Sequence, residues 1–254
     1  TDIRIQTTDR RYIMKLFIIR HGDPDYTIDS LTEKGRKEAA LLAERLKNVK
    51  IDHFYVSPLG RAQATAKYTL DAMGRTAETC PWLREFDAHV KDIHTGEERI
   101  PWDMLPEDWT KIADYYDKDK WYDVPQMAEG HVIDEAKKVY DGIDGILARH
   151  GYERDGNIYK AVRPNRETVA LFCHFGVECV MLGHLLGVSP MVLWHGFCAA
   201  PTSVTVLTSE ERREGKAYFR VNTFGDTGHL YAKGEEPAFA ARFCETFDSD
   251  ERHD

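Results

Sequence analysis

The sequence has no apolar run close to the length of about 20 residues that a membrane helix needs. Its first residues, 1–11, are polar and charged, and they do not resemble a secretory signal. Internal repeats and low-complexity tracts are absent as well. These absences predict a globular protein that has no membrane partner.

Cysteine is scarce, and its pattern argues against a disulfide framework. The five cysteines are an odd number and include no CxxC pair. Cys80, Cys173 and Cys198 stand in apolar or strand-like surroundings. We interpret the cysteines as buried free thiols, which predicts a reducing, cytoplasmic location.

The sequence has fewer basic than acidic residues, with 34 lysines and arginines against 43 aspartates and glutamates, and its net charge is −9. This balance argues against nucleic acid as a partner. It does not exclude a phosphate ligand, because nearby groups set the field inside a cleft. The hydrophobic share of 42% is ordinary for a globular protein, so the chain can bury a sizeable core.

Strands and helices alternate along most of the chain. Short apolar runs rich in β-branched residues predict strands, and apolar residues spaced by three and four predict helices. Strands are expected at 15–19, 52–56, 77–80, 168–173, 203–207 and 217–223, and helices at 33–48, 59–73, 134–149 and 177–186. This alternation is typical of a three-layer α/β/α sandwich with a mainly parallel sheet.

Residues 86–134 interrupt the alternation with aromatic residues that crowd among charges and prolines. We expect a single domain over 1–254 that carries a helical cap insertion at approximately 86–134. The insertion either packs a small core of its own or lines the substrate pocket and excludes water from it. A homodimer through the insertion or through an exposed edge strand stays open.

Three further segments are expected to lie outside the core. Residues 1–13 are interpreted as a leading arm or edge strand. The polar, Gly- and Pro-punctuated stretch 151–166 predicts a loop. The acidic tail from Lys233 is expected to be peripheral, with Phe239, Phe243 and Phe247 as the residues that could hold it.

The most informative motif is Arg20-His21-Gly22, which follows the apolar run 16–19. A buried strand therefore delivers an arginine and a histidine to the carboxyl edge of the sheet, where open α/β folds bind ligands. The fork of donors on arginine suits a phosphate, and a histidine can be a nucleophile near neutral pH. Gly22 is expected to let the backbone come close to a ligand.

Two other strands end in the same manner. The run 168–173 ends at His174, and the run 52–56 leads through Ser57 into a helix whose first turn holds Arg61. The free N–H groups of a helix start also favour an anion. If these strands are central and parallel, Arg20, His21, Arg61 and His174 converge around one phosphoryl group.

At this point the chain resembles the histidine phosphatase superfamily, the phosphoglycerate-mutase-like phosphatases. The matching segments are 17–26, 31–36, 57–62, 83–86, 172–176 and 225–230. The resemblance implies that His21 is the nucleophile and that Arg20, Arg61 and His174 hold the phosphoryl oxygens. It also implies that Glu85 is the proton donor, although Asp87 lies close by in the sequence. No metal and no cofactor are implied, because cationic side chains supply the electrostatics.

Other candidate residues have plainer interpretations. His229 matches a position that braces His21 or a loop, and Ser57 either hydrogen-bonds near the pocket or caps a helix. The remaining histidines that we considered show no metal-ligand spacing and are interpreted as structural or solvated: His89, His94, His131, His150, His184 and His195.

The function expected from this resemblance is a metal-independent phosphomonoester hydrolase that acts on a small phosphorylated substrate. Only a short loop separates His21 from Leu31, whereas mutases of the family carry a longer segment there. A phosphoglycerate-mutase-type transferase and a non-catalytic module that binds a phosphorylated ligand are the alternatives. A metal-dependent phosphoesterase using His21, Asp23 and Asp25 is a further rival.

Overall fold

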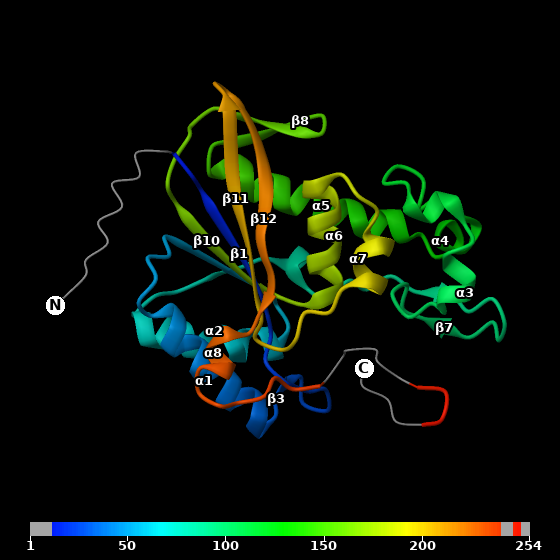
Figure 1. Ribbon diagram of the computed structural model, residues 1–254, viewed down its shortest axis with the longest axis horizontal. Helices are drawn as coiled ribbons and strands as arrows, with labels where there is room; N and C mark the ends of the chain where they lie inside the picture. The colour runs from blue at the N-terminus through cyan, green and yellow to red at the C-terminus, as the bar shows by residue number, and fades with distance from the viewer. Residues whose placement is uncertain (1–11, 240–245, 250–254) are drawn as a thin grey trace.

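A mixed sheet runs through the middle of the molecule (Figure 1). The computed structural model describes residues 12–239 and 246–249 of the chain. Within them the main sheet has eight strands in the order β5-β4-β10-β1-β11-β12-β9-β8. Its strands are β1 (Lys15–Arg20), β4 (His53–Val56), β5 (Glu78–Thr79), β8 (Tyr152–Asp155), β9 (Ile158–Ala161), β10 (Thr168–Cys173), β11 (Val204–Arg213) and β12 (Lys216–Asp226).

The sheet has a parallel half and an antiparallel half. Strands β5, β4, β10 and β1 pair in parallel, as the sequence predicts for the core of an α/β fold. Strand β11 pairs antiparallel with β1, and β12, β9 and β8 continue in the same manner. The α/β class with parallel core strands is confirmed. The strands β11 and β12 extend beyond the ends that were predicted for them.

The prediction of a loop at 151–166 is wrong, because β8 and β9 form an antiparallel hairpin there. Tyr152, Tyr159 and Ala161 are buried, while their neighbours along the strands are more exposed. Gly156 supplies the positive φ of the turn. The alternation of buried and exposed residues is that of a half-buried strand, which the glycines and Pro164 obscure in the sequence.

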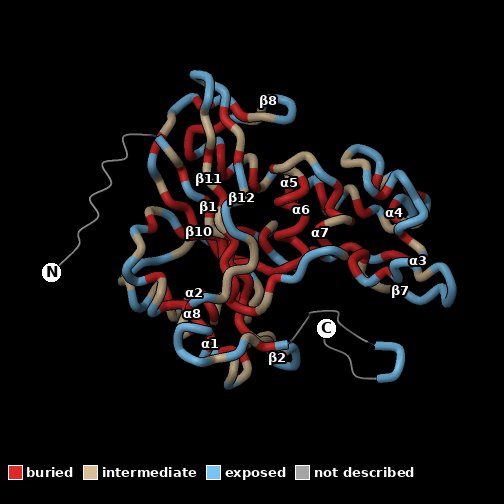
Figure 2. Tube along the Cα trace, viewed as in Figure 1, coloured by how far each residue is buried: buried red, intermediate tan, exposed pale blue. Residues whose placement is uncertain are grey.

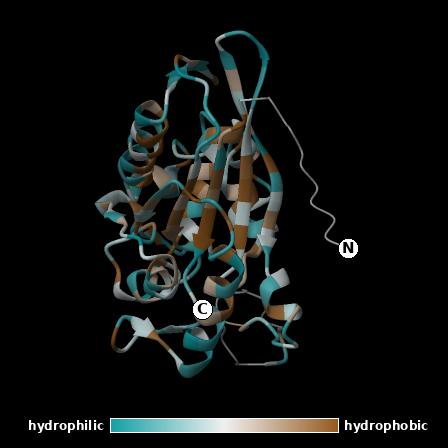
Figure 3. Ribbon diagram, turned by 90° about the vertical axis from the view of Figure 1, so that its left-hand side faces the viewer, coloured by the Kyte–Doolittle hydropathy of each residue, from teal (hydrophilic) through white to brown (hydrophobic). Residues whose placement is uncertain are grey.

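Helices cover both faces of the sheet and produce three layers. Leu42 of α1 and Ala66 of α2 pack with Ile19 on one face, whereas Ile143 of α5 packs with Ile18 in the core on the other face. Buried residues follow the central strands in Figure 2, and Figure 3 shows the same strands as hydrophobic. The longer helices are α1 (Glu33–Leu46), α2 (Gly60–Met73), α5 (Val132–Arg149) and α6 (Phe175–Leu186).

Residues 86–134 form mainly short elements whose buried side chains belong to the same hydrophobic core as α5 and α6. Trp102, Trp109, Tyr115 and Trp121 are buried in the same hydrophobic cluster as α5 and α6. The elements of this segment are β6 (Val90–Lys91), β7 (Glu98–Arg99), α3 (Pro106–Trp109), η2 (Ala113–Tyr116) and α4 (Pro125–Glu129). The aromatic residues of the segment therefore extend the main core, and this contact fixes the segment beside α6.

The remaining elements are small. They are β2 (Pro24–Asp25), β3 (Ser30–Leu31), η1 (Pro81–Leu83), α7 (Pro190–Gly196) and α8 (Gly228–Tyr231). Among the described residues, no helix is both long and apolar enough to cross a membrane. Cys80, Cys173 and Cys179 are buried as expected, but Cys198 is exposed, which corrects its assignment to the interior.

Polar contacts hold the described part of the tail. Phe239 is exposed and Phe247 is fully exposed, while Phe243 lies outside the described residues, as does most of the 1–13 arm. Glu38 of α1 is buried and accepts the backbone N–H of Ala238 at 2.8 Å. The other oxygen of Glu38 accepts the N–H of Asp23 at 3.0 Å. One buried carboxyl group thus joins the tail, α1 and the loop after His21.

Two glycines on α5 test how tightly this helix packs. A Cβ atom at Gly142 would lie 2.2 Å from the ring of Trp82 in η1, whereas one at Gly145 would meet nothing within 4 Å. We expect Gly142→Ala to lower the free energy of unfolding by about 1–3 kcal/mol through overpacking. Gly145→Ala should raise it by about 0.5–1 kcal/mol, because alanine favours a helix. Urea unfolding measures both, and shifts of the same sign would contradict the packing.

Candidate active site

The carboxyl ends of β1 and β10 bring two histidines together. The strands pair in parallel with Arg20 opposite Cys173, and His21 and His174 come next in each chain segment. Both imidazoles are buried, and their ring centroids lie 5.0 Å apart with the planes tilted by 56°. The convergence of these histidines, predicted from two strand ends far apart in sequence, is present in the structure.

His21 is held in one tautomer by its own loop. Its Nδ1 lies 2.7 Å from the carbonyl oxygen of Gly22. Because a carbonyl can only accept a hydrogen bond, Nδ1 carries the proton and Nε2 keeps a lone pair. Burial, with the charges of Arg20 and Arg61, holds the pKa of His21 well below its ordinary value. A neutral imidazole with a free Nε2 can act as a nucleophile near neutral pH.

His174 is connected to the end of β4 through Ser57. Its Nε2 lies 2.7 Å from the hydroxyl oxygen of Ser57, and this oxygen accepts the backbone N–H of Leu59 at 3.2 Å. Either the hydroxyl of Ser57 or Nε2 of His174 is the donor in this contact, according to the tautomer of the ring. Nδ1 of His174 is buried without a partner among the described residues. Burial, followed by His21 and Arg61, holds the pKa of His174 well below its usual value.

Ser57 contacts the ring of His174 and does not cap helix α2. The residue that caps α2 is Leu59, and it makes no side-chain cap hydrogen bond. The contact of Ser57 with the Leu59 N–H is part of the turn that leads into this helix. The side chain thus connects the end of β4 to the ring of His174.

The two arginines supply fixed donors. Arg20 is buried, donates from Nη1 to the carbonyl oxygen of Ala199 and lies 5.9 Å from the centre of the Phe175 ring. Arg61 lies in the first turn of α2, 5.3 Å from the centre of the Tyr26 ring. The Nε atoms of both arginines are buried without a partner among the described residues. A cluster of donors with unused capacity is suited to an anion.

Asp29 is a site residue that the sequence analysis missed. Its carboxylate accepts from Nη1 of Arg61 at 2.7 Å and from the backbone N–H of Gly60 at 2.6 Å. Burial opposes the charge of Asp29, but these two hydrogen bonds hold its pKa below the ordinary value. Asp29 thus aligns Arg61 and occupies the start of α2, the place expected to favour an anion. Its loop position with positive φ leaves no recognisable signal in the sequence.

Glu85 follows η1 and lies against the start of α6. Its Oε1 accepts the backbone N–H groups of Phe86 at 2.8 Å and Val177 at 3.1 Å. Burial raises the pKa of Glu85, although Arg20 and the two hydrogen bonds oppose the shift. A carboxyl group in this state can hold a proton closer to neutral pH.

The neighbouring Asp87 has a different environment. It is exposed and forms an ion pair with Arg84 at 3.0 Å. The structure therefore places Glu85, rather than Asp87, against the helix that follows His174.

A glycine and a tryptophan define the space beside Glu85. A Cβ atom at Gly176 would lie 2.7 Å from Oε1 of Glu85 and 2.8 Å from Cη2 of Trp102. The ring of Trp102 packs in turn against Phe86 and Trp194, with centroids 6.2 and 5.8 Å away. An aromatic residue of the segment 86–134 thus reaches the first turn of α6, next to the carboxyl group.

Gly22 and His229 support the loops of the site. A Cβ atom at Gly22 would lie 2.8 Å from the carbonyl oxygen of Gly35 in α1. Close packing against α1 is therefore enough to require a glycine here, where the sequence suggested that the glycine gives a ligand access to the backbone. Nε2 of His229 contacts the hydroxyl of Thr202 at 3.1 Å, and the N–H of Thr202 donates to the carbonyl oxygen of His21 at 3.0 Å. Burial lowers the pKa of His229 to about 4, so it braces this loop as a neutral ring.

Comparison with curated proteins finds relatives over part of the chain. The probable phosphoglycerate mutase GpmB of Yersinia pestis is 35% identical over 108 residues, which cover 39% of this chain and 49% of that protein. The protein of the same name from Yersinia pseudotuberculosis matches to the same extent. The chain therefore spans about half the length of the curated relatives it matches.

Solved structures share the fold over most of the chain. Phosphoserine phosphatase of Entamoeba histolytica, solved with phosphoserine, has a TM-score of 0.57 at 21% identity and covers 85% of this chain and 99% of its own. Mycobacterial glucosyl-3-phosphoglycerate phosphatase has a TM-score of 0.56 at 19% identity, with 84% and 99% covered. At these identities the likeness shows the fold alone.

The family itself follows from the pattern of residues along the chain. The model of the histidine phosphatase superfamily (branch 1) matches residues 16–222, which run from the second residue of β1 through β10 and into β12. The chain belongs to the histidine phosphatase superfamily.

Proposed function

We propose that the protein is a phosphomonoester hydrolase that acts through a phosphohistidine intermediate on His21 and needs no metal for this chemistry. The observation that carries the proposal is the buried imidazole of His21, which is held through Nδ1 by Gly22 and lies 5.0 Å from the ring of His174. Burial and the charges of Arg20 and Arg61 lower its pKa and favour the neutral ring. The substrate is a small phosphorylated molecule, the class that the phosphoserine-bound neighbour illustrates.

The reaction proceeds in two displacements at phosphorus. Nε2 of His21 attacks, the P–O bond of the ester breaks, and Glu85 gives its proton to the departing alkoxide. Water then attacks the phosphorus of the phosphohistidine and loses a proton to Glu85. The P–N bond breaks, inorganic phosphate leaves, and His21 and Glu85 return to their starting protonation states.

Fixed donors stabilise the charge that develops on the phosphoryl oxygens. The guanidinium groups of Arg20 and Arg61 and the imidazole of His174 contribute without a large rearrangement, because Ala199, Asp29 and Ser57 already hold them. Positively charged side chains here do the work that a metal ion does in many phosphoryl transfers.

The insertion at approximately 86–134 contributes the leaving-group side of the pocket in this proposal. Trp102 lies beside Gly176 and Glu85, so its ring would contact the part of the substrate that Glu85 protonates. An apolar wall at this position lowers the local polarity and favours the protonated form of Glu85.

A mutase is the second candidate, favoured by the similarity of 108 residues to a protein named as a phosphoglycerate mutase. The two functions share the first displacement and differ in what attacks the phosphohistidine.

Incubation with 3-phosphoglycerate distinguishes the hydrolase from the mutase. A hydrolase releases inorganic phosphate, whereas a mutase forms 2-phosphoglycerate with little release. A binding module would release no phosphate from 3-phosphoglycerate or from p-nitrophenyl phosphate.

Replacement of the nucleophile is the first test. We expect His21→Ala to lower kcat on p-nitrophenyl phosphate by about 1,000-fold or more, because no other group can form the intermediate. The reaction is followed by p-nitrophenol absorbance, with EDTA and without added metal. His94→Ala, which changes an exposed histidine paired with Asp108, is the control and should leave kcat unchanged. Equal rates for His21→Ala and the parent protein would refute the nucleophile.

The acid role of Glu85 predicts a dependence on the leaving group. Glu85→Gln should lower kcat by about 100-fold or more on an alkyl phosphate and much less on p-nitrophenyl phosphate, whose leaving group needs little protonation. Comparable losses on both substrates would count against the assignment.

The pH profile gives an independent check of the same pair. The raised pKa of Glu85 keeps its proton to higher pH, and the lowered pKa of His21 keeps the ring neutral to lower pH. Activity on an alkyl phosphate should therefore rise with pH through the pKa of His21 and fall through that of Glu85. In Glu85→Gln the alkaline fall should disappear from kcat/KM. If the alkaline fall of kcat/KM persists in Glu85→Gln, another group must cause it.

A further inference from the structure

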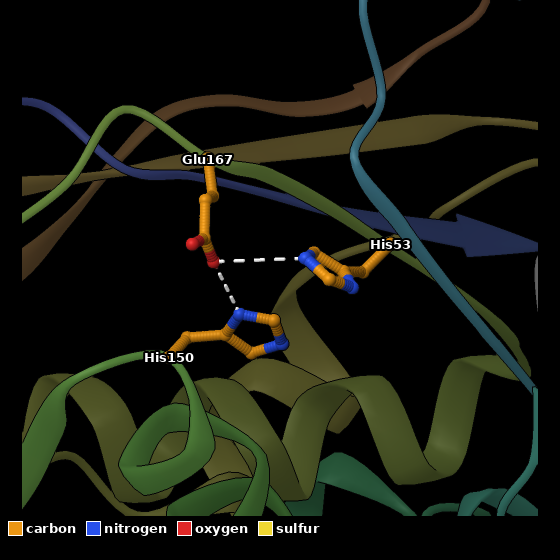
Figure 4. A group of neighbouring side chains, drawn as sticks. All are labelled: His53, His150 and Glu167. Carbon is orange, nitrogen blue, oxygen red and sulfur yellow. Dashed lines mark hydrogen bonds and ion pairs between the residues drawn. The ribbon is translucent and has the colours of Figure 1, made fainter.

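A second cluster of titratable side chains, shown in Figure 4, lies where strands β4 and β10 begin. His53 begins β4, Glu167 directly precedes β10, and His150 follows the last residue of α5. One ligand atom from each lies within 4.8 Å of the others. Strand β10 separates this cluster from His174 by about 20 Å, at about 3.3 Å for each residue.

We propose that His53, His150 and Glu167 form a binding site for a divalent transition-metal ion of the zinc type, separate from the catalytic edge. Two imidazole nitrogens and one carboxylate oxygen are a donor set that zinc accepts, with water as the fourth ligand. The site would tie the end of α5 to the starts of two core strands.

The distances are close to those that such an ion requires. Oε2 of Glu167 lies 2.5 Å from Nδ1 of His150 and 3.8 Å from Nε2 of His53. In a tetrahedral site with bonds of about 2.0–2.1 Å, ligand atoms are about 3.3 Å apart. The first pair must therefore open by about 0.8 Å and the second must close by about 0.5 Å. The ion replaces the proton that lies between Nδ1 of His150 and Glu167, and the single proton of the neutral ring is then carried on Nε2.

Outer contacts already orient two of the three ligands. Nε2 of His150 lies 2.9 Å from the hydroxyl of Tyr55, which can accept its proton when Nδ1 binds the ion. Oε1 of Glu167 accepts from Nη1 of Arg163 at 3.1 Å, which leaves Oε2 for the ion. Such outer partners are the usual support of metal ligands. The same guanidinium opposes a second positive charge, so the affinity should be weaker than that of a four-ligand structural site.

The backbone around the ligands is also held. The side-chain amide of Asn165 donates to the carbonyl oxygen of His150 at 2.6 Å and accepts the N–H of Glu167 at 2.9 Å. His150 is buried, whereas the side chain of His53 is 47% exposed. An ion can therefore enter from solvent past His53, and this residue can be replaced with little effect on packing.

The test uses the full chain after treatment with a chelator and its removal. Isothermal titration with ZnCl₂ should show saturable binding of one ion, and the melting temperature should rise with zinc. Co²⁺ should give the absorption bands of a tetrahedral site with nitrogen and oxygen ligands. His53→Ala should weaken zinc binding by at least about 10-fold. His94→Ala, another exposed histidine bonded to a carboxylate, is the matched control and should bind as the parent does.

Glu167→Gln gives a second, independent variant, because it keeps the size of the side chain and removes the anionic ligand. It should also weaken zinc binding. Absence of saturable binding in the parent, or unchanged affinity in His53→Ala and Glu167→Gln, would overturn the proposal. Hydrolysis of p-nitrophenyl phosphate is measured in parallel and should be the same for the parent and His53→Ala, so a failed metal site and a failed hydrolase are distinguishable.

Discussion

The parallel pairing of β1 with β10 is the constraint on which the site depends. Its register sets Arg20 opposite Cys173, so the next residue of each strand is a histidine at the same edge of the sheet. Because successive side chains alternate between faces, a shift of one residue would separate the rings and turn the core residues Leu16 and Ile18 toward the wrong layer. The register that buries the hydrophobic residues of β1 is therefore the same register that brings the two imidazoles together.

Because the site is buried, it is costly for all of its basic side chains to carry a positive charge at once. Two imidazoles and two guanidinium groups share a small volume, and four positive charges there would repel one another strongly. The structure avoids this cost by keeping His21 and His174 neutral and by pairing Arg61 with Asp29. The same desolvation that lowers the histidine pKa values raises that of Glu85. One physical cause thus favours the neutral forms of the two histidines and of Glu85.

The sequence predicted the parts of the site that follow from local patterns. Apolar runs identified the strands, and the parallel arrangement then placed His21, Arg61 and His174 near one another. Contacts made only by the fold were missed. One is the contact of the loop residue Asp29 with Arg61, and the other is the cluster in which His53 meets His150 and Glu167, which follow it by about 100 residues in sequence. The hairpin of β8 and β9 was missed because its strands are short and mostly polar outside Tyr152 and Tyr159.

The central claim is that phosphorus becomes bonded to Nε2 of His21 during turnover. The most direct measurement is rapid quenching at alkaline pH, which preserves phosphohistidine, followed by mass spectrometry of the peptide that contains residue 21. The account predicts a phosphoryl group on His21 that forms before inorganic phosphate appears and decays as it is released. Phosphate release with no phosphorylated histidine at any time, or with the phosphoryl group on another residue, would contradict it.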